Sequence, residues 1–260
     1  MGVDKNSISS DFTDPTQVNS FEGFKNLASR SNISKFEKIG FPDSYRDGHE
    51  FAICEDIVDK LQLIEKESLD LLDIGSGCSD LPGHLLKIAQ ENNHSLTLLD
   101  SEEMHQNLSM EVRSGTKQVN AQFPNCPEFI NEHQGTFDSI LCYSVIQYPF
   151  LESSIFKFLD SMLVLLKPGG RLLIGDIPNL SMKKRFLNSS AGKEFHKQYY
   201  GQDSQVDIGW NTNGFDKMDD SVVIALIMRA RIAGFHAYLV PQSEKLPLSN
   251  RREDILIVKP

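Results

Sequence analysis

The sequence lacks long apolar runs, closely paired cysteines and an excess of positive charge. A membrane-spanning helix needs about 20 consecutive apolar residues, and a signal peptide needs an apolar core, so we expect neither. The cysteines stand far apart, at Cys54, Cys78, Cys126 and Cys142. This spacing argues against a disulfide framework or a metal site and favours a reducing, cytoplasmic setting.

Positive charge is scarce: 26 Lys and Arg stand against 36 Asp and Glu, for a net charge of −10. Binding to a nucleic-acid backbone depends on phosphate neutralisation, so we expect no nucleic-acid partner and no membrane partner. The 260 residues, 40% of them hydrophobic, are typical of a globular protein with one large domain. A small-molecule or saccharide partner fits this balance, and self-association stays open.

The segment most informative about function is an apolar run, Leu69 to Ile74, followed by Gly75 and Gly77. This pattern predicts a buried parallel strand that turns tightly into a helix, where bare backbone can approach a ligand. A dinucleotide fingerprint needs a third glycine where Asp80 stands, and a carboxylate there would repel a pyrophosphate. Asp73 instead favours a positively charged ligand. The alternative is a glycine turn without any ligand.

Asp73-Ile74-Gly75-Ser76-Gly77 resembles the first motif of the Rossmann-like (class I) S-adenosylmethionine-dependent methyltransferases. The resemblance implies an α/β fold with a seven-stranded, mostly parallel sheet, an antiparallel last strand and helices on both faces. It also implies S-adenosylmethionine as cofactor, bound at Asp73, Gly75, Ser76 and Gly77. The order of predicted strands and helices agrees, and the two closing strands, Phe235 to Val240 and Asp254 to Val258, lack a helix between them.

Further cofactor contacts are expected after the next strands. The second strand, Ser95 to Leu99, ends in Asp100, whose carboxylate suits the vicinal hydroxyls of a ribose, with Ser101 beside it. After the third strand the resemblance places Gln122 and Phe123 near the adenine, although the acidic residue common there is replaced by Gln122.

The fourth strand, Phe137 to Cys142, leads into a segment that in the family lies against the methionine part of the cofactor. This implies Tyr143 and Ser144 as cofactor residues and Gln147 as a substrate residue. In the loop at positions 40–48, Arg46 is a hypothesis for the methionyl carboxylate and Tyr45 for the substrate. The alternative is a surface loop that covers the core.

The domain prediction is a flexible arm at 1–20, a helical cap at 21–65 and a methyltransferase domain at 66–260. A helical substrate lid is expected at 178–216, inserted after the fifth strand. Its aromatic residues Tyr199, Tyr200 and Trp210 suit a ring or sugar acceptor. The alternative is a small helical cap with its own core.

Two residues are candidates for a general base: Asp176 at the end of the fifth strand, and His196 in the insertion. The alternative for Asp176 is a turn-capping carboxylate. We predict in-line methyl transfer to a small-molecule, sugar or glycan acceptor. An NAD(P)-dependent oxidoreductase and a non-catalytic S-adenosylmethionine-binding module remain alternatives.

Overall fold

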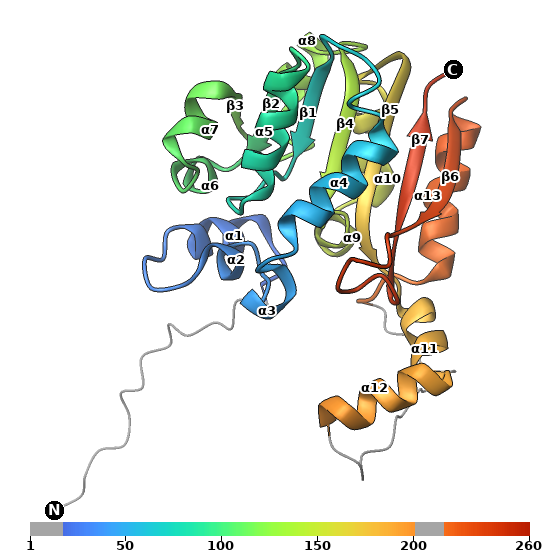
Figure 1. Ribbon diagram of the computed structural model, residues 1–260. Helices are drawn as coiled ribbons and strands as arrows, with labels where there is room; N and C mark the ends of the chain where they lie inside the picture. Colours follow the sequence, from blue (N-terminus) through green and yellow to red (C-terminus); the bar gives the residue numbers. More distant parts are fainter. Residues whose placement is uncertain (1–17, 201–215) are drawn as a thin grey trace, which may run out of the picture.

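The computed structural model describes residues 18–200 and 216–260, without the side chains of residues 199 and 200, and is built on one seven-stranded sheet (Figure 1). The strand order is β3-β2-β1-β4-β5-β7-β6. In chain order the strands are β1 (Asp70–Ile74), β2 (Ser95–Asp100), β3 (Lys117–Asn120), β4 (Phe137–Tyr143), β5 (Leu166–Pro178), β6 (His236–Pro241) and β7 (Arg252–Val258).

Strands β1 to β5 are parallel, while β7 runs antiparallel to both β5 and β6. The loop between β6 and β7 holds no crossover helix, so these two strands can only pair as antiparallel neighbours. The predicted sheet, with its antiparallel last strand, is confirmed. β7 lies between β5 and β6, so the edge of the sheet is β6.

Helices cover both faces of the sheet, as predicted (Figure 1). Alternation along β1 sends Leu72 and Ile74 into one core and Leu71 into the other. The first core is covered by α8 (Pro127–Glu132), α10 (Ile155–Leu163) and α13 (Asp220–Ile232). The second is covered by α4 (Glu50–Leu61), α5 (Leu81–Glu91), α6 (Glu102–Gln106) and α7 (Met110–Gly115).

The N-terminal helices divide into two groups. The short helices α1 (Phe21–Ala28), α2 (Lys35–Lys38) and α3 (Asp43–Arg46) lie beyond the carboxyl ends of the parallel strands (Figure 1). α4 instead packs against α5 and β5. Of the helical cap expected at 21–65, α1 to α3 therefore lie over the carboxyl ends of the parallel strands, whereas α4 belongs to the helical layer on one face of the sheet.

The chain after β5 forms the helix pair α11 (Leu180–Asn188) and α12 (Ser190–Tyr200), which projects from the sheet (Figure 1). No residue of α11 is buried. Between β4 and β5 the chain forms two helices, α9 (Gln147–Glu152) and α10, because the Ser154 hydroxyl caps a new helix by accepting from the Lys157 amide. Among the described residues, no helix is long and apolar enough to cross a membrane.

Candidate functional site

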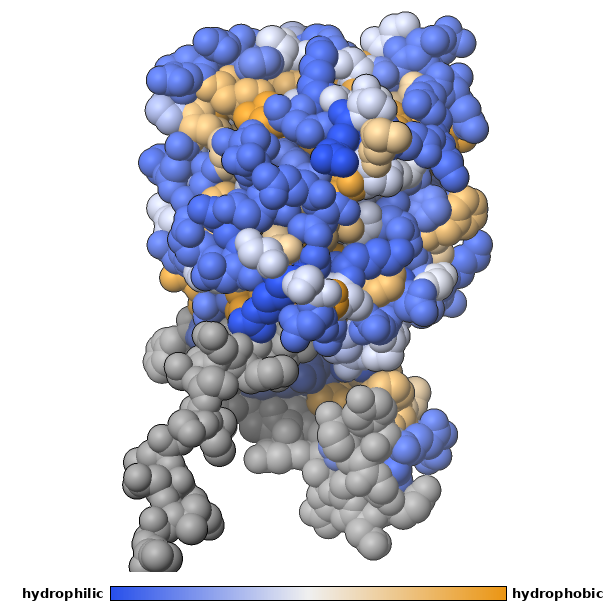
Figure 2. Space-filling model, turned by 90° about the vertical axis from the view of Figure 1, so that its left-hand side faces the viewer, coloured by the Kyte–Doolittle hydropathy of each residue, from blue (hydrophilic) through white to orange (hydrophobic). Residues whose placement is uncertain are grey.

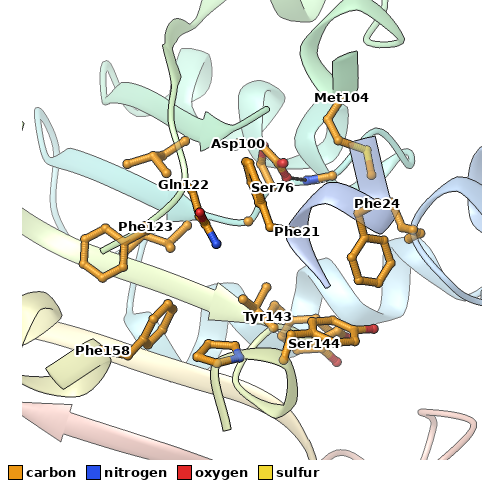
Figure 3. Close-up of a pocket in the computed structure, with 18 of the residues that line it drawn as sticks. Phe21, Phe24, Ser76, Asp100, Met104, Gln122, Phe123, Tyr143, Ser144 and Phe158 are labelled. Carbon is orange, nitrogen blue, oxygen red and sulfur yellow. Dashed lines mark hydrogen bonds between the residues drawn. The ribbon is translucent and has the colours of Figure 1, made fainter. Parts of the chain in front are cut away.

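A cavity of about 290 Å³ lies at the carboxyl ends of β1, β2 and β4, where open α/β sheets place ligands (Figure 3). The turn after β1 lines one wall and the segments after β3 and β4 line others. The helices α1 and α9 complete it with Phe21, Phe24, Tyr148 and Glu152. The Phe24 and Tyr148 rings meet edge to face at 4.6 Å, and the Phe21 amide donates to Glu152 Oε2 at 3.3 Å. These contacts roof the cavity.

The glycine turn has the predicted geometry. Gly75 and Gly77 have φ angles of 74° and 64°, in the region that side chains disfavour. A Cβ on Gly75 would lie 2.5 Å from Val145 Cγ2, so the turn packs tightly against the segment after β4. Ser76, between the two glycines, is buried and lines the cavity, and its Oγ has no hydrogen-bond partner. A buried unpaired hydroxyl in a cavity wall is suited to a polar ligand atom.

Asp100 lines the cavity beside this turn (Figure 3). Its carboxylate accepts from the Gly77 amide at 2.8 Å and from the Ser101 amide at 2.7 Å. Burial raises its pKa, and the two amides oppose that shift. Each oxygen keeps a lone pair for a further donor, such as a ribose hydroxyl. Ser101 does not line the cavity: its hydroxyl caps α6 by accepting from the Met104 amide.

Asp73 lies beneath the turn rather than in the cavity wall. It is only 2% exposed, and its Oδ2 has no hydrogen-bond partner. Burial, with a smaller contribution from the charge of Asp100, raises its pKa to about 8. A cation that approaches such a buried carboxyl lowers its pKa and favours its ionised form.

The opposite side of the cavity is formed by Gln122 and Phe123, which follow β3 as expected (Figure 3). β3 ends at Asn120, after which the Ala121 amide donates to the Asp100 carbonyl. The Gln122 amide points into the cavity, while the Phe123 ring packs edge-on against Phe158 at 5.1 Å. Together they offer an amide edge and apolar surface to a flat ring.

Arg46 reaches the cavity from α3 and is buried. Its guanidinium donates to Ser144 Oγ at 2.6 Å and to Glu50 Oε1 at 3.3 Å, and it lies 4.4 Å from the centre of the Phe41 ring. Asp176 Oδ2 also lies 3.7 Å from Arg46 Nη2, so the guanidinium is fixed between two carboxylates at one end of the cavity.

Glu50 is a residue that sequence reasoning missed. Its Oε2 accepts from the Leu81 amide at 2.8 Å and from the Ser79 hydroxyl at 2.6 Å, so it caps α5 from another helix. Asp80 holds the N-cap position of α5 without a capping side-chain bond and pairs with Lys35, while Ser79 Oγ also accepts from the Leu81 amide, at 3.4 Å. The Leu81 amide at the start of α5 therefore already has a hydrogen-bond partner in Glu50. The only signal in the sequence is the helical spacing of Arg46 and Glu50.

Ser144 directly follows β4, and Asp176 lies in the neighbouring strand β5 at a register shift; both have positive φ angles, 60° and 59°. The Ser144 hydroxyl donates to Asp176 Oδ2, and Arg252 Nη1 donates to the same oxygen at 2.9 Å. Ser144 and Tyr143 line the main cavity, whereas Asp176 does not. A carboxylate already bonded to a serine and an arginine is suited to positioning Ser144.

Other predicted residues lie outside the cavity wall. Gln147 donates to the Ser144 carbonyl, and its Oε1 is buried without a partner. Tyr45 borders a small void on the far side of Arg46. His196 lies on α12 and does not line the cavity. Tyr199 and Tyr200 end α12 with side chains that are not described, and Trp210 lies outside the described residues.

The site therefore defines an α/β protein that binds an adenosyl compound. It combines an acid at the end of β2, a glycine turn after β1 and the unpaired Ser76 Oγ in the cavity wall, with the Asp73 carboxyl buried outside that wall. A sequence model of the family described as "Methyltransferase domain" matches residues 46–216. The chain belongs to this family, the class I S-adenosylmethionine-dependent methyltransferases, and uses that cofactor. This membership overrules the nicotinamide oxidoreductase alternative.

Solved methyltransferases share the fold. The plantazolicin methyltransferase BpumL in complex with SAH is 16% identical, with a TM-score of 0.53 over 92% of this chain and 96% of that one. The CurJ carbon methyltransferase is 15% identical, with a TM-score of 0.56 over 92% and 67%. A SAM-dependent methyltransferase from Aquifex aeolicus is 17% identical, with a TM-score of 0.52 over 88% and 99%. A search of curated proteins finds no match.

Proposed function

We propose that this methyltransferase acts on a small molecule, with a saccharide as one acceptor class, and that the cavity roofed by α1 and α9 holds the cofactor. The observation that carries the assignment is the unpaired, buried Ser76 Oγ in the cavity wall at the glycine turn; the unpaired Asp73 Oδ2, just before the turn, is buried outside the wall. A roofed cavity of about 290 Å³ admits little beyond the cofactor and a compact reacting group.

Each part of the cofactor has a matching group in the wall or, in the case of Asp73, buried outside it. Asp100 suits the ribose hydroxyls, and Gln122 with Phe123 suits the adenine. The Arg46 guanidinium suits the methionyl carboxylate, and the negative charge that Asp73 acquires on ionising suits the positive charge of the ammonium or sulfonium. S-adenosylmethionine, when bound, supplies an electrophilic methyl group on sulfur.

The protein's contribution is chiefly orientation. Holding two reactants in line supplies about 7–11 kcal/mol of a bimolecular barrier. The rigid turn at Gly75, the Ser144–Asp176 contact and the aromatic roof serve this purpose, since each fixes one wall of the cavity and excludes water. A base is needed only when the acceptor starts protonated.

For a hydroxyl acceptor the two candidate bases are Asp176 and His196. Asp176 is proposed to act through Ser144, which it holds at the cavity wall. His196 could reach an acceptor only if the α11–α12 pair, proposed as a substrate lid with Tyr199, Tyr200 and Trp210, closes over the cavity. Measuring methyl transfer by Asp176→Asn and His196→Gln variants against pH separates these roles, because loss of a base removes the acidic limb of the profile.

The cofactor assignment is tested by calorimetric titration with S-adenosylhomocysteine. We expect Asp100→Asn to weaken binding by about tenfold or more, because it loses charge-assisted bonds to the ribose. Asp80→Asn is the matched control, since Asp80 is an exposed carboxylate that pairs with Lys35 and follows the glycine turn by a few positions. This variant should bind as the wild type does. Equal affinities in all three proteins would refute the assignment.

The acceptor class is tested by labelled-methyl transfer to panels of sugars, amines, carboxylates and flat heterocycles. Transfer to one panel of small molecules supports the proposal. Transfer only to proteins or nucleic acids contradicts it. Binding of S-adenosylhomocysteine without transfer to any panel favours the non-catalytic module.

A further inference from the structure

Hydrophilic residues cover much of the outer surface, as on the side of the molecule that carries α6, α7 and β3 (Figure 2). One cluster of charged residues lies inside the protein instead, between the cavity and β7. Arg46, Glu50 and Asp176 are only 4%, 3% and 6% exposed, and Asp254 of β7 is fully buried. Buried ions are costly unless opposite charges and hydrogen-bond partners surround them. The balance of charge within this cluster therefore decides what charge Arg46 presents to the cavity.

Asp176 lies at the centre of the cluster and is held by β7. The register of β5 against β7 shifts between Ile174 and Ile177, and Asp176 lies in this irregularity. Arg252 Nη1 donates both to the Asp176 carbonyl, at 2.8 Å, and to Asp176 Oδ2, at 2.9 Å. The Asp176 amide in turn donates to Asp254 Oδ1 at 2.8 Å. Two residues of β7 thus fix the backbone of Asp176, and Arg252 also pairs with its carboxylate.

The Asp176 carboxylate also faces Arg46. Asp176 Oδ2 lies 3.7 Å from Arg46 Nη2, and Glu50 Oε1 lies 3.3 Å from Arg46 Nη1. The Phe41 ring accompanies both arginines, with the Arg46 and Arg252 guanidinium carbons 4.4 Å and 5.6 Å from its centre. Arg46 lines the cavity, whereas Arg252 lies behind it. Two arginines and two carboxylates therefore alternate around Arg46 and Asp176, with the charges in balance.

We propose that Arg252 is a positioning residue for the cofactor: by pairing with Asp176 it leaves the positive charge of Arg46 available to the methionyl carboxylate. This role rests on the proposed function, in which Arg46 binds that carboxylate. Without Arg252, the carboxylates of Glu50 and Asp176 together outweigh the single charge of Arg46. This end of the cavity then repels an anion instead of attracting it.

The groups behind Asp176 do not replace Arg252. Lys60 Nζ lies 2.8 Å from Asp254 Oδ2 and 2.5 Å from Asp56 Oδ2. Gln242 Nε2 donates to Asp254 Oδ1 at 3.1 Å and carries no charge. This group of two carboxylates and one ammonium brings no net positive charge to Asp176.

The proposal has a signature that a purely structural role of Arg252 lacks. Decarboxylated S-adenosylmethionine keeps the adenosine, the sulfonium and the amine of the cofactor and lacks only its carboxylate. Loss of Arg252 should therefore weaken the binding of S-adenosylmethionine and leave the decarboxylated compound unaffected or bound more tightly. A distorted cavity would weaken the binding of both.

Calorimetric titration with each compound measures this preference for the carboxylate. We expect the wild type to prefer S-adenosylmethionine, and Arg252→Gln to reduce the ratio of the two affinities by about tenfold. Arg252→Met, which keeps an unbranched apolar stem beside Phe41, should do the same and replaces Arg252→Gln should thermal unfolding show that the latter does not fold. Arg229→Gln is the control, since Arg229 is an exposed arginine that pairs with Asp160 at 2.6 Å, and it should keep the wild-type ratio.

Two further variants test whether charge is the cause. Arg252→Lys keeps the positive charge and should retain most of the preference. Asp176→Asn combined with Arg252→Gln removes one charge of each sign and should restore the preference to within about threefold of the wild type. Neither variant leaves an additional unpaired carboxylate beside Arg46.

The proposal is overturned by an unchanged ratio in Arg252→Gln or Arg252→Met, by equal weakening of both compounds, or by a double variant that does not recover the preference. A wild type that binds both compounds equally well contradicts the assignment of Arg46 in the proposed function as well. A clear wild-type preference that survives the loss of Arg252 overturns only the role of Arg252 and leaves the proposed function standing.

Discussion

Replacing Asp73 by asparagine should change how the stability of the ligand-free protein depends on pH. Asp73 is 2% exposed and its pKa is raised from 3.8 to about 8, mainly by burial. Between these values the unfolded chain has lost the proton and the folded protein keeps it. The folded state therefore binds more protons, and the free energy of unfolding falls as pH rises.

The magnitude follows from the linkage relation. One titrating group changes the free energy of unfolding by at most ~1.36 kcal/mol per pH unit, in the range where it is protonated in the folded protein and ionised in the unfolded chain. The pKa of Asp254 is also raised, by burial, but only to about 6, so its contribution fades above that pH. Between about pH 6.5 and pH 8 the wild type should therefore lose up to ~2 kcal/mol through Asp73.

Urea unfolding at half-unit pH steps measures this slope. Asp73→Asn cannot ionise, so its unfolding free energy should be nearly flat in this window. Asp70→Asn in the same strand is the control, because Asp70 is an exposed carboxylate paired with Lys167, and it should keep the wild-type slope. An Asp73→Asn slope equal to that of the wild type, or a wild type more stable at pH 8 than at 6.5, would refute the reasoning.

Three further outcomes follow from the site. Arg46→Ala should weaken S-adenosylhomocysteine binding about tenfold in a calorimetric titration, and unchanged affinity would remove Arg46 from the carboxylate site. Glu50→Gln should lower the urea midpoint by an amount equivalent to ~1–3 kcal/mol, since the buried cap of α5 and the Arg46 contact lose their charge; an unchanged midpoint would contradict this role. Gly75→Ala should destabilise the protein by more than ~1 kcal/mol, because its Cβ would meet Val145 at 2.5 Å and φ is 74°; wild-type stability would show that the turn relaxes.

Local sequence patterns were sufficient for the sheet and for the cofactor motif. Alternating apolar runs and glycine turns predict β1, β2, β4 and β5 because strand formation and tight turns depend on neighbouring residues. The same holds for the positions of Gly75, Gly77 and Asp100, which lie together at the cavity, whereas their contacts to the cofactor stay a prediction. Residues Lys167 to Gly170 lie within β5, and Gly169 has a φ of 75° there.

Contacts between segments distant in sequence were decided only by the tertiary structure. Glu50 caps α5 from 31 positions away, and Arg46 meets Ser144 from 98 positions away. Phe21 and Phe24 are ordinary helix residues by pattern, and they line the cavity because α1 crosses its mouth. Asp176 and Ser101 lie near the carboxyl ends of strands, but their oxygens accept hydrogen bonds from neighbouring protein groups, Ser144 and the Met104 amide. Strand position determines which residues approach a ligand, whereas three-dimensional packing decides which of their polar atoms remain unpaired to bind it.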